Sequence, residues 1–110
     1  VWDWDITNDR VFFSARWKEM LGYAETEVGS RLGEWSERLH PDDRAAVHAA
    51  LAPHLDGRTP HYESEHRLRY KDGSYKWVLD RGKVVARDAD GAPLRAVGTH
   101  TDIADRKRAE

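Results

Sequence analysis

The chain has 110 residues, of which 39% are hydrophobic, 18 are basic and 20 are acidic. This length supports one globular domain with a modest core, and the balanced charge gives no field that would recruit nucleic acid or an anionic membrane. The absence of cysteine excludes disulfides, a thiol nucleophile and cysteine–zinc sites. No apolar run reaches the roughly 18 residues of a membrane span. We expect a cytoplasmic domain, and one without direct membrane contact in this segment.

The N-terminal part predicts two short strands and then short helices. Residues 1–7 alternate Trp2, Trp4 and Ile6 with acidic residues, as a half-buried strand does. A turn at Asn8-Asp9 leads into a second strand over residues 10–14. A helix capped by Ser14 is expected through Gly22, and residues 25–39 read as short helical turns.

The longest internal helix is predicted over residues 41–55. Pro41 suits the first helical turn, and Asp42 and Asp43 would meet the positive end of the helix dipole. Pro53 lies within the pattern and should kink or shorten the last turn.

The C-terminal half predicts three antiparallel strands. Lys71-Asp72-Gly73-Ser74 and the longer loop of residues 88–93 each contain Asp-Gly or a similar turn signal, and both are too short for a crossover helix. The last strand runs directly into a charged helical segment, residues 104–110. A sheet that ends in a connector is therefore expected.

Several motifs in this order resemble the PAS domains with a PAC motif, of the PAS fold-3 type found in bacterial multidomain signalling proteins. They are WDWDI (2–6), WKEMLGY (17–23), HPDDR (40–44), KDGSYKWV (71–78) and VGTHTDI (97–103). The resemblance covers nearly the whole chain. It implies an α+β fold with a five-stranded antiparallel sheet and helices packed on one face. Ala104 departs from the family pattern, which has threonine there.

The resemblance also implies a function. Such domains are sensory or interaction modules that regulate a covalently linked output domain, here a GGDEF diguanylate cyclase or a histidine kinase, and they are not enzymes themselves. We expect a PAS/PAC sensor over residues 1–103 and the start of a helical signalling linker over residues 104–110. Because the chain opens inside a strand and closes inside a helix, it resembles an excised module, and the parent protein is open to membrane anchoring through its flanks.

No cofactor is identified by the sequence. The flavin adduct of the LOV photosensors needs a cysteine, which is absent. Haem-binding PAS domains use a histidine on the long helix, where His48 and His54 lie. A histidine on a helix flank is more often packed or solvated, so haem is not expected.

The inward strand positions supply the ligand-pocket candidates. Alternation in the strand over residues 62–68 puts Ser64, His66 and Leu68 on the buried face. Similarity to flavin-binding relatives sets the phase of the next two strands and turns Val78, Asp80 and His100 inward, with His100 at the place of a flavin-contacting glutamine. Ser64, His66, Asp80 and His100 are therefore expected to converge.

Two interpretations of this cluster stay open. In the first it orients a small-molecule ligand or changes charge with pH. In the second, which is favoured, the polar groups satisfy one another inside a closed core. No metal-binding motif, phosphate loop or nucleophile elbow is present, so neither a metal site nor catalytic residues are expected.

The opposite face of the sheet carries an apolar strip that predicts a homodimer. Its members are Trp77, Leu79, Val97, Thr99 and Ile103. An uncovered strip of this kind is a liability, so we expect dimerisation, a helix preceding residue 1, or both to cover it. Asp102 and Ile103 would be the signal exit. The alternative to a ligand sensor is a ligand-free PAS dimerisation module.

Overall fold

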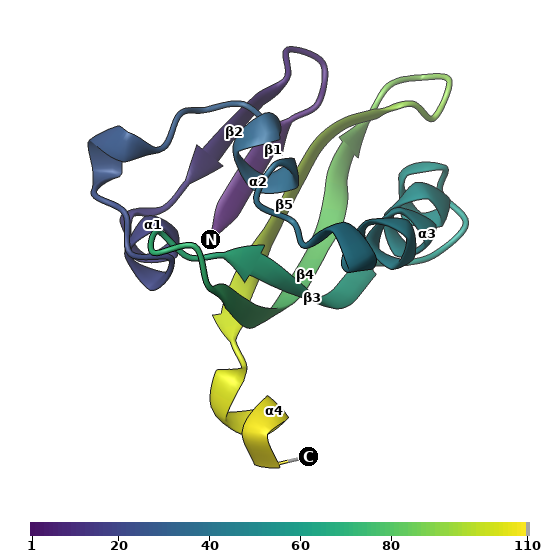
Figure 1. Cartoon of the computed structure of the whole chain (residues 1–110). Coiled ribbons are helices and arrows are strands. Elements are labelled where there is room, and N and C mark those ends of the chain that lie inside the picture. Colours follow the sequence, from purple (N-terminus) through teal and green to yellow (C-terminus); the bar gives the residue numbers. More distant parts are fainter. Residues whose placement is uncertain (110) are drawn as a thin grey trace.

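The computed structural model describes residues 1–109 and contains an antiparallel sheet of five strands in the order β2-β1-β5-β4-β3. The N-terminal hairpin is formed by β1 (Trp2–Asp5) and β2 (Arg10–Phe13), and the C-terminal half forms β3 (Tyr62–Arg69), β4 (Tyr75–Arg87) and β5 (Pro93–Asp102). Strand β5 lies between β1 and β4, so the first and the last strand of the chain are neighbours in the centre of the sheet (Figure 1). The predicted fold class is confirmed.

Most of the helices connect β2 to β3 and cover one face of the sheet (Figure 1). They are α1 (Ala15–Met20), η1 (Glu25–Glu27), α2 (Gly33–Ser36), η2 (Pro41–Asp43) and α3 (Arg44–Leu55). A further helix, α4 (Ala104–Ala109), follows β5 and projects beyond the sheet (Figure 1). None of the helices in residues 1–109 has the length and apolar character that crossing a membrane requires.

Local sequence signals set the helix boundaries. Ser14 caps α1, where its Oγ accepts the Trp17 N–H at 3.2 Å. The helix predicted from Pro41 begins as the 3-10 turn η2, in which His40 Nδ1 accepts the Asp42 N–H, and becomes α-helical only at Arg44. Pro53 is accommodated in the last turn of α3, which still extends to Leu55.

The hydrophobic core lies between the helices and the sheet, because one face of each strand carries the apolar side chains. Every second residue of β2 is buried, and β3 and β4 show the same alternation around their central residues. The main members of the core are Trp2, Val11, Phe13, Trp17, Leu21, Val28, Trp35, Leu39, Val47, Leu68, Val78, Val84 and Ala96.

The strand register puts three polar residues in one row across the buried face. Ser64 of β3 pairs with Asp80 of β4, and Asp80 pairs with His100 of β5. The inward phase predicted for these strands is therefore the phase that the structure has. Beside this row, Gly82 pairs with Gly98, and the Trp2 indole packs so closely on both glycines that a Cβ at either position would collide with the ring.

The free edge of β3 is covered by the connector between α2 and η2. The His40 N–H donates to the Arg67 carbonyl at 3.0 Å, and the Arg69 N–H donates to the Arg38 carbonyl at 2.8 Å. Leu39 and Leu68 form an isolated bridge between these two bonds. The connector thus pairs the edge and ties the inner helices to the sheet.

Candidate functional site

A buried carboxylate, Asp80, is the centre of the polar row. Its side chain points from β4 into the core, and the residue is 2% exposed. The Trp2 Nε1–H of β1 donates to Asp80 Oδ1 at 3.0 Å. Buried carboxylates need such donors, because desolvating an unpaired charge costs several kcal/mol.

His100 of β5 connects Asp80 to helix α1. The Trp17 Nε1–H donates to His100 Nδ1 at 2.9 Å. Since an indole nitrogen is only a donor, Nδ1 is unprotonated and the proton of the neutral ring is on Nε2. His100 Nε2 lies 3.3 Å from Asp80 Oδ2, but the two groups are not aligned as a hydrogen bond, and Nε2 has no hydrogen-bond partner among residues 1–109. The Trp2–Asp80 and Trp17–His100 hydrogen bonds, together with the close contact between Asp80 and His100, form one polar network that joins β1, β4, β5 and α1.

His66 of β3 lies next to this network and is completely buried. Burial lowers the pKa of His66 to about 4, although the Asp80 charge acts in the opposite direction, so the ring is neutral at pH 7. Its Nδ1 is 3.1 Å from Ser64 Oγ, while Nε2 has no partner in the described part of the chain. The ring packs edge-on against His100 and Trp35.

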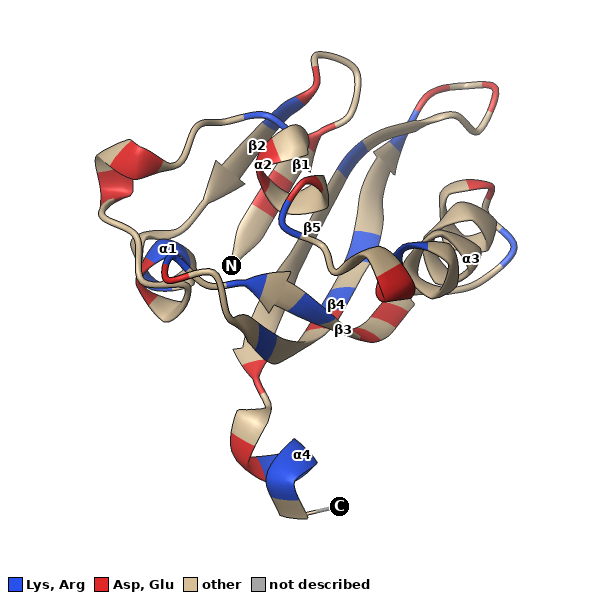
Figure 2. Ribbon diagram, in the orientation of Figure 1, with Lys and Arg blue, Asp and Glu red and all other residues tan. Residues whose placement is uncertain are grey.

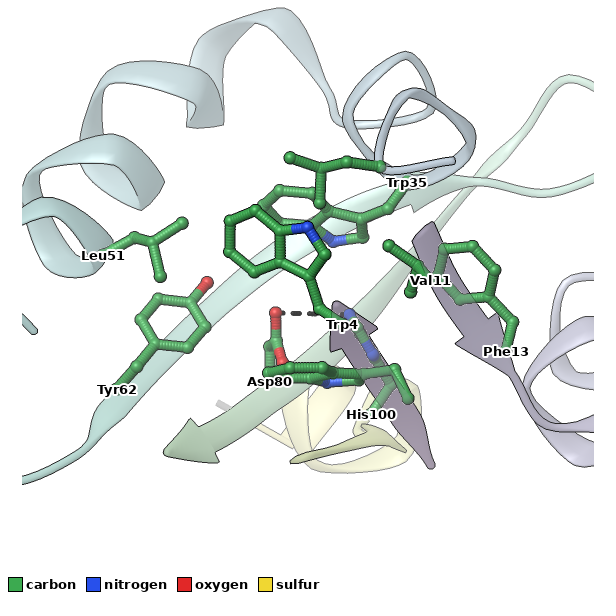
Figure 3. Close-up of a pocket in the computed structure, with 10 residues that line it drawn as sticks. Trp4, Val11, Phe13, Trp35, Leu51, Tyr62, Asp80 and His100 are labelled. Atoms are coloured by element: carbon green, nitrogen blue, oxygen red, sulfur yellow. Dashed lines mark hydrogen bonds and ion pairs between the residues drawn. The ribbon is translucent and has the colours of Figure 1, made fainter. Parts of the chain in front are cut away.

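A cavity of about 30 Å³ adjoins Asp80 and His100. Figure 3 shows the Trp4 ring between Tyr62 and Leu51 on one side and Val11 and Phe13 on the other. Trp2, Leu32 and Trp35 complete the lining. The volume admits water but is far below the roughly 300–1,000 Å³ of drug-sized ligand sites. A flavin or a haem does not fit this cavity.

Several polar atoms around the cavity are buried without a hydrogen-bond partner among residues 1–109. They are Trp4 Nε1, Trp35 Nε1, the Tyr62 hydroxyl and His100 Nε2. Burial, and then the nearby Asp80 charge, raise the pKa of Tyr62, so its hydroxyl remains protonated. These N–H and O–H groups can donate hydrogen bonds to a molecule in the cavity. The apolar side chains of the lining cannot do so.

His66, Asp80 and His100 also place one potential metal-ligand atom each within 4.8 Å of one another. Neighbouring ligands of a tetrahedral zinc ion lie about 3.4 Å apart, so a metal would require the group to contract. It would also need the His100 Nε2 lone pair, whereas the Trp17 hydrogen bond puts a proton on that atom. The hydrogen bonding therefore favours an internal polar network over metal coordination.

The structure places the predicted pocket residues in two groups. Asp80 and His100 line the cavity, and Ser64 and His66 stand beside them in mutual contact. Leu68 and Val78 do not line it and are completely buried core residues. Of the six candidates, only Asp80 and His100 thus face the cavity.

The histidines weighed as haem ligands have other positions. His48 is exposed on α3. His54 is buried, and both of its ring nitrogens are used: Nδ1 is 2.8 Å from the Thr59 carbonyl, and Nε2 accepts the Val84 N–H at 2.9 Å. His54 thus holds the end of α3 against β4.

The outward face of the sheet differs from the prediction at Ile103. Trp77, Leu79 and Val97 are half-buried and Thr99 is exposed, but Ile103 is only 6% exposed. The physical reason is that the chain leaves β5 at Asp102, donates the Ile103 N–H to the Trp77 carbonyl at 3.1 Å and begins α4 against β4. Ile103 therefore does not belong to an exposed strip.

The indole donors of the network were not identified from the sequence. Trp2 and Trp17 belong to the hydrophobic core, yet each also satisfies a buried acceptor. A buried tryptophan N–H usually requires a partner. The inward phase of Trp2 and Asp80 on strands of the same sheet was the available signal, but the strand order that brings them together was needed to use it.

Comparison with known proteins agrees with this geometry. The family model described as the PAS fold matches residues 10–100. The uncharacterised protein y4lL of Sinorhizobium fredii is 35% identical over 108 residues, which are 97% of this chain and 12% of that protein. A crystal structure of a sensory box histidine kinase/response regulator from Burkholderia thailandensis superposes with a TM-score of 0.86 at 37% identity, covering 98% of this chain and 79% of that one.

A second crystal structure shares the fold at lower identity. It is the N-terminal domain of a diguanylate cyclase with a PAS/PAC sensor from Marinobacter aquaeolei, with a TM-score of 0.81 and 21% identity over 96% of this chain and 95% of that one. By contrast, this chain spans only a small part of the curated relatives it matches, 12% of the first and 5% of the second.

Proposed function

Because this chain belongs to the PAS fold family, we propose that it is a sensory or interaction module that regulates an output domain of a larger signalling protein. The output domain is proposed to be a GGDEF diguanylate cyclase or a histidine kinase. The observation that carries this proposal is the 37% identity, over 98% of this chain, to the sensory box histidine kinase of Burkholderia thailandensis. The domain itself is regulatory and not catalytic.

The proposed division of the chain follows the end of the sheet. Residues 1–103 form the sensor, and residues 104–110 begin the signalling linker. Strand β5 carries His100 in the polar network and reaches α4 after Asp102 and Ile103. Because kinases and cyclases use cytoplasmic nucleotides, the module is proposed to act in the cytoplasm, with any membrane anchor of the parent lying outside it.

A signal acts only by binding two arrangements of a domain unequally. We place the ligand-binding site at Ser64, His66, Asp80 and His100 together with the cavity next to them. Support comes from the buried polar atoms without partners among residues 1–109, such as Trp4 Nε1 and the Tyr62 hydroxyl. A ligand larger than water must first move α2 or α3, which supply Trp35 and Leu51, away from the sheet.

A second candidate, a ligand-free dimerisation module, is favoured by the small cavity. Trp4 and its neighbours already fill most of the space between the helices and the sheet. In this case the function would lie in the outward face, where Trp77, Leu79, Val97 and Thr99 are proposed to meet a second copy of the chain.

Native mass spectrometry of the freshly purified domain, paired with its visible absorption spectrum, distinguishes the candidates. A retained small mass that is lost in the double variant His66→Ala/His100→Ala and kept in the control His48→Ala supports the ligand sensor. A dimer without added mass, together with unchanged output from the parent protein carrying the double variant, supports the dimerisation module. Output that does not respond to deletion of the whole domain contradicts both.

A further inference from the structure

We infer that α4 is coupled to the inner helices by a chain of contacts, Asp43–Arg67–Trp77–Lys107, that passes round the β3 edge of the sheet. This series of contacts is a second route to the linker, separate from the polar network on β5. The physical coupling is a property of the domain alone. Its regulatory meaning rests on the proposed function, in which α4 leads to an output domain.

The first link joins η2 to the edge strand. Asp43 is the last residue of η2 and directly precedes α3. Its carboxylate accepts from Arg67 Nη2 at 2.7 Å, from Arg67 Nε at 3.0 Å and from the Arg67 backbone N–H at 2.8 Å. These hydrogen bonds from Arg67 hold the pKa of Asp43 below its usual value. A bidentate guanidinium–carboxylate pair of this kind fixes geometry as well as charge.

The second link crosses from β3 to β4 on the outward face. Arg67 and Trp77 are register partners in the β3–β4 ladder. The Arg67 guanidinium carbon lies 4.9 Å from the centroid of the Trp77 ring, within cation–π range. An edge strand permits this arrangement, because Arg67 can contact the sheet face with its guanidinium while the same group reaches the helix beside the edge.

The third link brings α4 to the same ring. Lys107 Nζ lies 4.7 Å from the Trp77 centroid, so the indole is shared by two cations. Glu65 lies two residues before Arg67 on β3 and therefore on the same face of the sheet. Its carboxylate holds α4, with Oε1 at 2.7 Å from Lys107 Nζ and Oε2 at 2.9 Å from Arg106 Nη2. Figure 2 shows these basic residues gathered on α4 after the acidic start of the helix. The α4 position is thus defined by β3 and β4 side chains.

Opening of the cavity supplies the movement that this series of contacts would transmit. The cavity is about 30 Å³ and is bounded by Trp35 of α2 and Leu51 of α3. A larger occupant must displace one of these helices, and the inferred coupling responds to displacement of α3. Because α3 starts immediately after Asp43, that displacement changes the position of the carboxylate, then of the Arg67 guanidinium, and finally the environment of Lys107 over Trp77. Asp43 and Arg67 are positioning residues in this proposal.

Nuclear magnetic resonance tests the coupling directly. Stacking over Trp77 gives the Lys107 side-chain methylenes an upfield ring-current shift, and α4 formation protects the Lys107 N–H, which donates to the Ile103 carbonyl at 3.0 Å. We expect Asp43→Asn to reduce the ring-current shift and to speed exchange of this amide about fivefold or more. The matched control is Glu63→Gln, whose ion pair with Arg81 joins the same two strands and includes none of the residues Asp43, Arg67, Trp77 and Lys107, and it should leave both values unchanged.

Reciprocity provides a second variant that leaves η2 intact. A coupling between two sites acts equally in both directions, so Lys107→Gln should speed exchange of the Arg67 N–H, which donates to Asp43. The inference is overturned if the Lys107 methylene shifts in Asp43→Asn are the same as in the wild type. It is also overturned if the Arg67 amide exchanges in Lys107→Gln at the wild-type rate. Neither readout involves a ligand or an output domain, so this failure leaves the proposed sensory function standing. Intact coupling with an unregulated parent protein would instead reject that function.

Discussion

Asp80 is the residue on which the buried side of the sheet depends most. It is a carboxylate at 2% exposure, and it contacts Trp2 from the first strand and His100 from the last. Loss of one partner of a buried charged group costs more than the hydrogen bond itself contributes, because the other partner stays desolvated. Side chains that look alike in the sequence therefore differ in what their removal does.

Trp2 and Trp4 provide a direct comparison of this kind. Trp2→Phe removes the N–H donor to Asp80, whereas the Trp4 Nε1–H has no partner among residues 1–109. We expect Trp2→Phe to lower the free energy of unfolding by about 1–3 kcal/mol more than Trp4→Phe. Urea unfolding followed by circular dichroism measures both. Equal losses would mean that the Trp2–Asp80 bond has no net effect.

Gly98 permits the close approach of the Trp2 ring to the sheet. A Cβ at this position would collide with the Arg81 carbonyl oxygen and with the indole, and the former belongs to the backbone and cannot rotate away. Gly98→Ala should therefore destabilise the domain by about 2 kcal/mol or more. The control is Gly33→Ala at the start of α2, where the nearest atom is 3.7 Å away and alanine should be neutral or slightly stabilising. A shift in thermal midpoint that is the same in both variants would contradict this assignment.

At the scale of the elements, the contact between η2 and β3 holds the helical layer to the sheet edge. Backbone hydrogen bonds from His40 and to Arg38 pair the edge of β3, and Asp43 binds Arg67 next to them. The Asp43 side chain is 14% exposed and that of Arg67 is 28% exposed, so this ion pair is less screened than the pairs on the open face. Its contribution should therefore be measurable and dependent on pH.

The pH dependence follows from the lowered pKa of Asp43. A carboxyl group with a folded pKa below its unfolded value stabilises the fold fully above the unfolded pKa of about 3.9 and loses that contribution as the pH falls through the folded pKa. Asp43→Asn should thus lower the free energy of unfolding by about 1–3 kcal/mol at pH 7, and the difference from the wild type should shrink below pH ~4.

Chemical denaturation at pH 7 and near pH 3 checks this prediction. Glu63→Gln is the control, because its pair with Arg81 is more exposed, at 44% and 65%, and should change stability by less than about 1 kcal/mol. A difference between Asp43→Asn and the wild type that stays constant from neutral to acid pH would show that the carboxylate charge is not what stabilises the η2–β3 contact.

At the scale of the whole molecule, the sheet has one face covered by helices and one face that α4 touches only near its end (Figure 1). Leu79 and Val97 remain half-buried on the open face, among residues of both charge signs such as Arg81, Lys83 and Glu63. A second copy of the chain placed there would cover the apolar centre while its charged rim stayed in water, as protein interfaces commonly do.

Leu79→Asp tests this proposed dimer. A carboxylate in the centre of the interface faces its own symmetry mate or apolar surface, so the dimer dissociation constant should rise about tenfold or more. Sedimentation equilibrium measures the change, and His48→Asp adds the same charge on the exposed side of α3 as a control. A wild-type chain that stays monomeric at high concentration would contradict the dimer proposal and would leave the description of the fold unchanged.

The sequence by itself determined the strands, the helical order and the direction of most side chains. Alternation around His66 turned Ser64 and Leu68 inward, and Asp-Gly turns made the C-terminal strands antiparallel, because a period of two and a short loop leave few alternatives. The resemblance then set the phase of Asp80 and His100, which the structure also has. These properties depend on residues within one strand or on the turn to the next strand, which are close together in the sequence.

Only the tertiary structure decided which of these side chains meet and what space remains between them. The pairing of β1 with β5 brings Trp2 to Asp80 across 78 positions of sequence, and α1 brings Trp17 to His100 across 83. The burial of Ile103, the small volume left by Trp4 and the path from Asp43 to Lys107 likewise depend on packing between distant segments. Side-chain volume and donor geometry in three dimensions fix such features, and neither is encoded in the spacing of residues along the chain.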